Sequence, residues 1–245
     1  MGSPPMAGSV WSAKLTDWKM ILMPQPPRKL IVLGDSGVYG WGDPLEGGWC
    51  ERLRRCWMSV PGAPVIYSLG IRGDGLEAVA ARWRNEWSAR GELRRQRPTG
   101  LVLAVGLNDS ARIGRPDGGQ KLDADAFGFG LERLLREMAT QTWVMVLGLT
   151  AVNENAMPFA GCLWYANDDV AVHESRIEEV CMELDLPFLE LHRLMRKQPA
   201  WSSMLEPDGI HLNGNGHAWI HERLRNWSPL LNWAGFEGEI AQPQA

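Results

Sequence analysis

The chain has 245 residues, of which 45% are hydrophobic, so it can bury the core of an α/β domain. Its formal net charge of -4 and its pI near 5.8 exclude a protein that binds nucleic acid or an anionic membrane mainly by charge. No internal repeat or linker-like break divides the chain, which favours a single domain.

The two ends differ in composition from the middle of the chain. Residues 1–28 are rich in proline near their end and are expected to form an irregular arm; residues 29–228 form the domain, and residues 229–245 form a tail. The longest apolar stretch of the arm, residues 20–23, is too short for a signal peptide, and no stretch is long enough to span a membrane. The cysteines have neither metal-ligand spacing nor a dense disulfide pattern, so we expect free thiols and a cytoplasmic location.

Strand-like and helix-like segments alternate along the chain. This alternation predicts a parallel sheet covered by helices on both faces. The fold class we expect is therefore α/β: a three-layer α/β/α sandwich with a five-stranded parallel sheet, flavodoxin-like. The expected strands are 29–34, 65–69, 101–106, 143–149 and 187–191, and the expected helices lie near 47–58, 75–89, 124–139, 168–184 and 216–227.

The Gly-Asp-Ser tripeptide at 34–36 directly follows the apolar run 30–33. It places the Ser36 hydroxyl at the carboxyl end of a strand, where open α/β sheets carry out their chemistry. A serine nucleophile needs a base, and that base needs a third group to orient it. Asp208 and His211 lie three residues apart in a Gly- and Asn-rich stretch and offer both groups. The Gly-x-Ser-x-Gly elbow is absent, which disfavours the α/β-hydrolase fold that carries it.

Two further segments follow strand-like runs and offer hydrogen-bond donors for an oxyanion. Gly70 can present a backbone N–H without a side chain in the way, and Asn108 can present its amide. Each residue also suits a plainer role, since Gly70 can end a strand in a turn and Asn108 can hold its own loop. The strand ends and the late Asp208 loop converge on one rim of the sheet.

Four separated blocks in this order resemble the SGNH hydrolases, also called the GDSL esterase/lipase family, over residues 28–228. The blocks are Gly34-Asp35-Ser36, Gly70, Gly106-Leu107-Asn108-Asp109 and Asp208-Gly209-Ile210-His211.

The resemblance implies catalytic roles for residues in each of the four blocks. Ser36 is implied as nucleophile and first oxyanion donor, Gly70 and Asn108 as the other donors, and Asp208 and His211 as the remainder of the triad.

The chain departs from the family pattern at two positions near these blocks. Gly37 stands where the family usually has an aliphatic residue, and Ser68 where an Asn is common. Neither change removes a catalytic group. Asp35 and Asp109 are expected to support the site through hydrogen bonds.

The resemblance implies a serine ester hydrolase that cleaves carboxylic esters, with short acyl chains expected, through a Ser-His-Asp triad and an acyl-enzyme. Such an enzyme needs neither a metal nor an organic cofactor, and its partner is a small-molecule ester. The alternatives are a carbohydrate O-deacetylase or thioesterase of the same family, or a non-catalytic flavodoxin-like binding module. The sequence leaves the oligomeric state open.

The longest connection on the active rim is 150–167, which contains several aromatic residues. These aromatics either line an acyl or alcohol pocket, with residues 40–49 as the facing wall, or cap the core. A loop of this size is too short to build a long apolar channel, hence the expected preference for short chains. His217 and His221 have the i, i+4 spacing of metal ligands, but no further ligand completes a set, so a structural or surface role is expected.

Overall fold

The computed structural model describes residues 27–90 and 97–236. Most of the expected N-terminal arm, and the last part of the expected tail, lie outside these residues. Among the described helices, none combines the length and the apolar character needed to cross a membrane.

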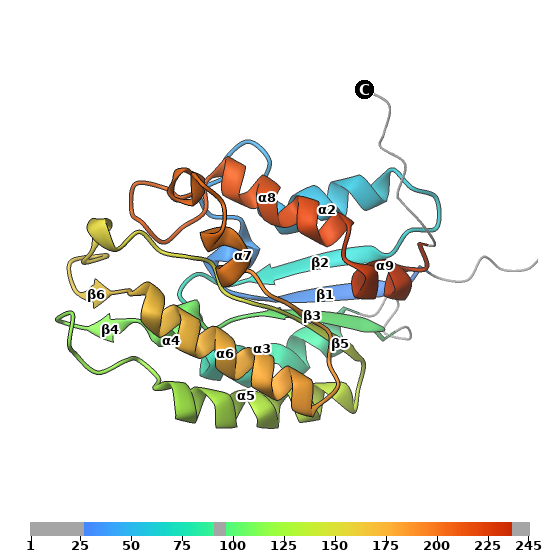
Figure 1. Cartoon of the computed structure of the whole chain (residues 1–245). Helices are drawn as coiled ribbons and strands as arrows, with labels where there is room; N and C mark the ends of the chain where they lie inside the picture. The colour runs from blue at the N-terminus through green and yellow to red at the C-terminus, as the bar shows by residue number, and fades with distance from the viewer. Residues whose placement is uncertain (1–26, 91–96, 237–245) are drawn as a thin grey trace, which may run out of the picture.

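Five parallel strands form the central sheet, which confirms the predicted fold class. The strand order is β2-β1-β3-β5-β7, and the reversal of direction in this order puts the β1 and β3 ends at the centre of one edge (Figure 1). The strands are β1 (Lys29–Gly34), β2 (Val65–Gly70), β3 (Gly100–Ala104), β5 (Trp143–Leu147) and β7 (Phe188–Leu189).

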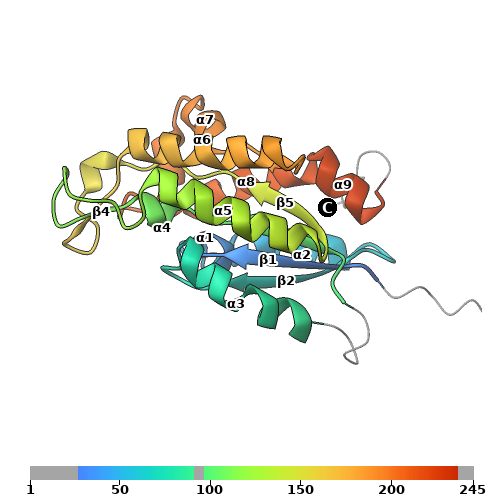
Figure 2. The same cartoon turned by 90° about the horizontal axis from the view of Figure 1, so that it is seen from below.

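Both faces of the sheet are covered, which is why β1 is a continuous apolar run rather than an alternating one. Ile31 and Leu33 pack into one core cluster, while Leu30 and Val32 pack into the other. On the first face lie the three helices α3 (Leu76–Ala89), α5 (Ala124–Ala139) and α6 (Asn167–Glu183), which come forward in Figure 2. On the second face lie α2 (Gly48–Met58), α8 (Gly214–Arg225) and α9 (Ser228–Ala234).

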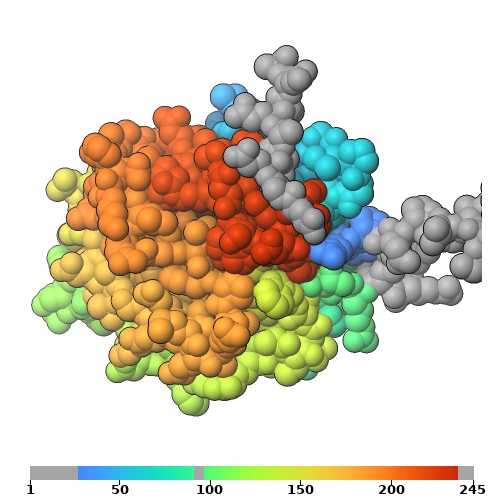
Figure 3. All heavy atoms as spheres, turned by 45° about the vertical axis from the view of Figure 1, so that its right-hand side comes forward, coloured from blue at the N-terminus to red at the C-terminus, as the bar shows by residue number. Residues whose placement is uncertain are grey.

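The expectation that a tail begins at residue 229 is wrong, because helix α9 occupies its first residues. Pro229 lies in its first turn, a position where a missing N–H costs nothing, and Leu230 is fully buried in the core. Trp233 donates from its indole N–H to the Thr99 carbonyl at 2.9 Å. In Figure 3 these red C-terminal residues lie between cyan residues of the α2 region and yellow-green residues near the start of β5. The fold therefore continues through residues 229–234.

The strand β7 is shorter than the expected 187–191. The buried carboxylate of Glu174 accepts hydrogen bonds from the Leu191 and His192 amides, at 3.1 and 2.9 Å. These bonds turn the chain out of the sheet into α7 (His192–Arg196). The same oxygen accepts from the Leu149 amide at 2.9 Å, so Glu174 ties the ends of β5 and β7 together.

Short elements occupy the rim beyond the carboxyl ends of the strands. They are α1 (Ser36–Tyr39), α4 (Leu107–Ser110), two 3₁₀ turns (Glu154–Ala156 and Trp201–Met204) and the antiparallel pair β4 (Arg112–Ile113) and β6 (Leu163–Trp164). The β4–β6 pair, which the sequence pattern does not predict, brings part of 150–167 against the segment that follows α4.

Candidate active site

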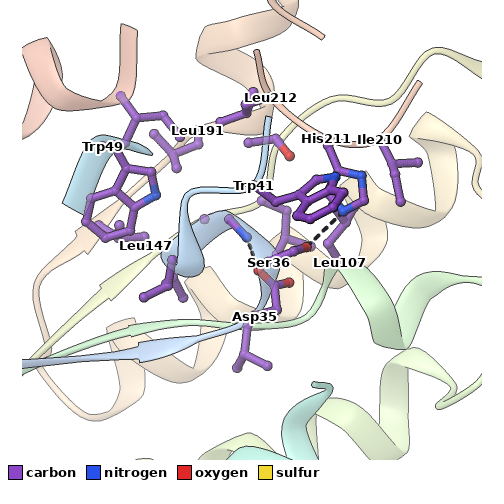
Figure 4. Close-up of a pocket in the computed structure, with 18 residues that line it drawn as sticks. Asp35, Ser36, Trp41, Trp49, Leu107, Leu147, Leu191, Ile210, His211 and Leu212 are labelled. Atoms are coloured by element: carbon purple, nitrogen blue, oxygen red, sulfur yellow. Dashed lines mark hydrogen bonds between the residues drawn. The ribbon is translucent and has the colours of Figure 1, made fainter. Parts of the chain in front are cut away.

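Ser36 is the first residue of α1 and follows β1 after a single residue. Asp35 caps this short helix, because its carboxylate accepts from the Gly37 amide at 2.8 Å. The sharp turn from strand to helix leaves the Ser36 side chain at the carboxyl edge of the sheet. Figure 4 shows its hydroxyl pointing toward His211.

Ser36, His211 and Asp208 form one hydrogen-bonded chain. The distance from His211 Nε2 to Ser36 Oγ is 3.1 Å (Figure 4). The distance from His211 Nδ1 to Asp208 Oδ2 is 2.6 Å. A carboxylate facing Nδ1 selects the tautomer with its proton there, which leaves Nε2 free to accept the serine proton. His211 is 8% exposed, so its ring is largely shielded from water.

Asp208 is held rigidly by its own turn. Its second oxygen accepts from the Ile210 and His211 amides, each at 3.0 Å. Partial burial opposes ionisation, but the bonds from the His211 imidazole and from these amides outweigh it, so the pKa of Asp208 lies below its ordinary value. The carboxylate thus stays charged and able to stabilise an imidazolium.

Asn108 lies on α4, directly beyond the end of β3. Its Nδ2 donates to Asp35 Oδ2 at 3.1 Å and to the Asp74 carbonyl at 3.0 Å, and its Oδ1 accepts from the Tyr165 hydroxyl at 3.3 Å. The structure therefore brings Asn108 into contact with the residue next to Ser36, as the convergence of strand ends predicts. Tyr165 is one of the aromatic residues of 150–167 that were expected to line a pocket or cap the core, and its bond to Asn108 was not predicted.

Gly70 is the last residue of β2 and lies beneath the backbone of α1. A Cβ on Gly70 would come within 2.2 Å of the Tyr39 amide nitrogen and 2.5 Å of the Asp35 carbonyl oxygen. Glycine is therefore required there for close approach of two backbones.

Gly73, three residues further on, was not singled out as a donor. Its φ is +84° and no atom lies within 4 Å of a Cβ built on it. It directly precedes Asp74, whose carbonyl binds Asn108, so its amide belongs to the turn nearest that side chain. The signal in the sequence is the Gly-Asp pair at 73–74, because a glycine in a tight turn marks a left-handed backbone.

The two supporting carboxylates are both buried. Desolvation, with further contributions from Asp109 and Asp74, raises the pKa of Asp35 to about 6. Asp109 accepts from the Leu76 amide at 3.1 Å and so ties α4 to the start of α3. Burial raises the pKa of Asp109 as well, although the Leu76 bond opposes the shift.

A cavity of about 60 Å³ adjoins Ser36 and His211 and extends toward the α2–α8 face. Its wall is mostly apolar and includes Trp49 (Figure 4) and Ile220. Its other lining side chains include Trp41, Leu107, Leu147, Leu191 and Leu212.

The aromatic residues of 150–167 do not line this cavity; from that segment only Thr150 does. Phe159 instead packs edge-on against His211, with ring centroids 5.7 Å apart, and also against Tyr165. The β4–β6 pairing brings this segment against the residues that follow α4, and the Tyr165 hydroxyl there donates to Asn108 of α4.

His217 has a structural role. Its Nδ1 accepts from the Trp49 amide at 3.2 Å, and its Nε2 lies 3.0 Å from the Trp41 carbonyl, to which it donates. Burial lowers the pKa of His217 and keeps the ring neutral, as this pattern of one accepted and one donated bond requires. It therefore ties the loop that carries Trp41 to the first turn of α2, where Trp49 lies. His221 lies one turn further along α8.

A parallel α/β sheet that presents a serine, a histidine and an aspartate, bonded in that order at its carboxyl edge, has the arrangement of a serine hydrolase. The model of the GDSL-like Lipase/Acylhydrolase family matches residues 32–219, so the chain belongs to that family. This match confirms the predicted family, whose model describes lipases and acylhydrolases.

Individual relatives agree with the family. A GDSL esterase/lipase from Arabidopsis thaliana is 29% identical over 96 residues, which are 37% of this chain and only 38% of that protein. Among solved structures, the lipase/acylhydrolase from Enterococcus faecalis has a TM-score of 0.64 at 20% identity, covering 80% of this chain and 92% of its own. An acetylxylan esterase from Geobacillus stearothermophilus has a TM-score of 0.63 at 16% identity, covering 88% and 97%. At such identities the structural likeness concerns the fold.

Proposed function

We propose that the protein hydrolyses carboxylic esters by way of an acyl-enzyme on Ser36. The observation that carries the proposal is the continuous chain from Ser36 through His211 to Asp208, with bonds of 3.1 and 2.6 Å. Nε2 of His211 removes the proton from Ser36 Oγ as that oxygen attacks the acyl carbon. Asp208 stabilises the resulting imidazolium.

The reaction then proceeds in two halves. The tetrahedral intermediate collapses, the acyl–oxygen bond to the alcohol breaks, and His211 gives its proton to the leaving alkoxide. His211 next takes a proton from water as that water attacks the acyl carbon. The bond to Ser36 breaks, Oγ recovers the proton, and the carboxylic acid leaves.

The oxyanion site completes the mechanism. We assign its donors to the Ser36 amide, to Asn108 and to the turn after β2. Within that turn, Gly70 and Gly73 are both candidates. Gly73 is supported by its place beside the Asp74 carbonyl that binds Asn108, whereas Gly70 is supported by the pattern of the four sequence blocks.

The two glycines are separated by a matched pair of variants. Gly73→Ala and Gly62→Ala place a methyl group at φ values of +84° and +77°, each with open space around the Cβ. Both substitutions cost about 1–2 kcal/mol of backbone strain. Alanine keeps the backbone N–H but disfavours the left-handed φ that aims it. If Gly73 supplies the donor, Gly73→Ala therefore lowers kcat and Gly62→Ala does not; equal kcat values in the two variants would argue against Gly73.

Short acyl chains are the proposed substrates, supported by the volume of the cavity beside Ser36. One water-sized group needs about 10–15 Å³ of such space. The 60 Å³ cavity therefore suits an acyl chain of a few carbons.

An acetylated carbohydrate is the second candidate substrate. An open hollow of about 700 Å³ lies next to Asp208, with Trp41 shared between it and the acyl cavity. Tyr39 and Trp41 are 58% and 39% exposed there, and Glu206 adds a carboxylate, so ring faces and acceptors are both offered to a polyhydroxylated alcohol. A structural neighbour is an acetylxylan esterase.

The experiment is an ester panel measured on the wild type and on Ser36→Ala. It contains nitrophenyl esters from acetate to palmitate, an acyl thioester and acetylated xylooligosaccharides. Hydrolysis that survives in Ser36→Ala contradicts the proposed nucleophile. Preference for the acetylated sugars over nitrophenyl acetate selects the second candidate, and preference for the thioester selects a thioesterase.

We also propose a cytoplasmic location, supported by four free cysteines. Their state in purified protein can be counted with a thiol reagent before and after denaturation.

A further inference from the structure

Tyr165 is a buried tyrosine whose hydroxyl reaches the side chain proposed to stabilise the oxyanion. Its side chain is 2% exposed, and its hydroxyl lies 3.3 Å from Asn108 Oδ1. Burial, with smaller contributions from neighbouring carboxylates, raises the pKa of this phenol above its ordinary value, so the hydroxyl keeps its proton.

The direction of this bond follows from the other partners of Asn108. The Asp35 carboxylate oxygen and the Asp74 carbonyl, at 3.1 and 3.0 Å, can only accept from it. A rotated amide would turn its own oxygen toward both acceptors, which is repulsive. Nδ2 therefore faces Asp35 and Asp74, and Oδ1 faces Tyr165, which must donate.

The segment that carries Tyr165 is fixed to the rim at several points. β6 pairs with β4, and Arg112 of β4 forms a two-bond ion pair with Asp169 of α6, both bonds at 2.6 Å. Phe159 packs edge-on against the Tyr165 ring, with centroids 6.4 Å apart. The ring is thus held in place before any substrate arrives, and little side-chain entropy remains to be lost during the reaction.

We propose that Tyr165 is a positioning residue of the oxyanion site, acting through Asn108. Both Nδ2 hydrogens of Asn108 are occupied in the free protein, so one of them must turn toward the substrate oxygen when negative charge develops. The Tyr165 bond to Oδ1 holds the opposite end of the amide during that exchange. It also withdraws electron density from the amide, which makes the N–H groups stronger donors.

The inference rests on the proposed function, and its test separates the two. Tyr165→Phe removes the hydroxyl and keeps the ring. We expect kcat to fall about three- to tenfold, the usual worth of one hydrogen bond, with KM little changed. Tyr67→Phe, in the middle of β2, is the matched control and should retain wild-type kcat and KM.

The decisive measurement is a double-mutant cycle with Asn108→Ala. If Tyr165 acts through Asn108, Tyr165→Phe causes no further loss of kcat in the Asn108→Ala background. An equal loss in both backgrounds, or an unchanged kcat in the single variant, overturns the inference. An enzyme that hydrolyses esters independently of Ser36 would instead overturn the proposed function.

Thermal unfolding of each variant shows whether the fold is intact. If Tyr165→Phe does not fold, 3-fluorotyrosine at the same position keeps the hydroxyl and makes it a stronger donor. kcat should then rise when Asn108 is present and stay constant when it is replaced by Ala. No rise in the presence of Asn108 overturns the inference.

Discussion

Enlarging the acyl cavity by the volume of one methylene group should shift the preference toward longer acyl chains. Ile220 lines the cavity and is 2% exposed. Ile220→Val removes one methyl group from that wall. The matched control is Ile177→Val, because Ile177 is 1% exposed but packs in the core on the opposite face of the sheet. Both variants should lose about 0.5–1.5 kcal/mol of stability, so stability alone cannot explain a difference in specificity between them.

The magnitude follows from the 60 Å³ volume of the cavity, which accepts a chain of about butyryl size. Each methylene buried is worth about 0.8 kcal/mol, so kcat/KM should rise about 15-fold from acetate to butyrate. Beyond butyrate the added methylenes gain no further burial in the cavity, and beyond about eight carbons kcat/KM should decline. In Ile220→Val the ratio of pentanoate to butyrate should increase by up to about fourfold, the worth of one methylene.

The assay is initial-rate hydrolysis of nitrophenyl esters below their critical micelle concentrations, with kcat/KM taken for each chain length. Ile177→Val should reproduce the wild-type profile. A steady rise through palmitate would refute the argument from cavity volume. So would the same profile change in both valine variants, because only Ile220 touches the cavity.

Three further predictions concern the triad, the oxyanion site and pH. Ser36→Ala and His211→Ala should each abolish nearly all hydrolysis, with the fold intact by circular dichroism. Asp208→Asn should lose as much activity or less, because it misorients the base without deleting it. Near-normal turnover in either alanine variant would show that residue to be unnecessary. Asn108→Ala should lower kcat by about a hundredfold or more with KM little changed, and a rise in KM alone would identify a binding residue. The pKa of Asp35 is raised from 3.8 to about 6, so its contribution to stability is present below its unfolded pKa and is lost as pH rises through about 6. In urea unfolding between pH 4 and 7, the free energy of unfolding of the wild type should therefore fall by about 2–3 kcal/mol more than that of Asp35→Asn. Parallel profiles would contradict this.

The parts of the fold that depend on local pattern could be predicted from the sequence. The apolar run 30–33 is buried on both faces, and such a run ending in Gly-Asp-Ser is itself enough to indicate a strand followed by a tight turn. The convergence of Asn108 on this turn could also be predicted, because the carboxyl ends of neighbouring parallel strands meet at one edge.

The parts that depend on distant partners could not be predicted. β7 ends early because the carboxylate of Glu174, which lies on α6, accepts hydrogen bonds from the amides of Leu191 and His192. The two-residue strands β4 and β6 have no periodicity of their own and depend on Arg112 and its partner on α6. The place of Tyr165 follows from that pairing, so its contact with Asn108 required the structure.

The helix α9 escaped prediction for a different reason. It is a short element that begins with a proline, and its burial of Leu230 depends on the space left between α2 and the sheet. Nothing in its local pattern distinguishes it from an exposed tail.

The claim that Ser36 is an activated nucleophile is tested most directly by labelling with a fluorophosphonate probe, followed by intact-mass and peptide mass spectrometry. We expect one adduct per chain, on the peptide that contains Ser36, with labelling lost in Ser36→Ala and strongly slowed in His211→Ala. Absence of labelling in an intact, folded protein, or an adduct on another serine that persists in Ser36→Ala, would contradict it.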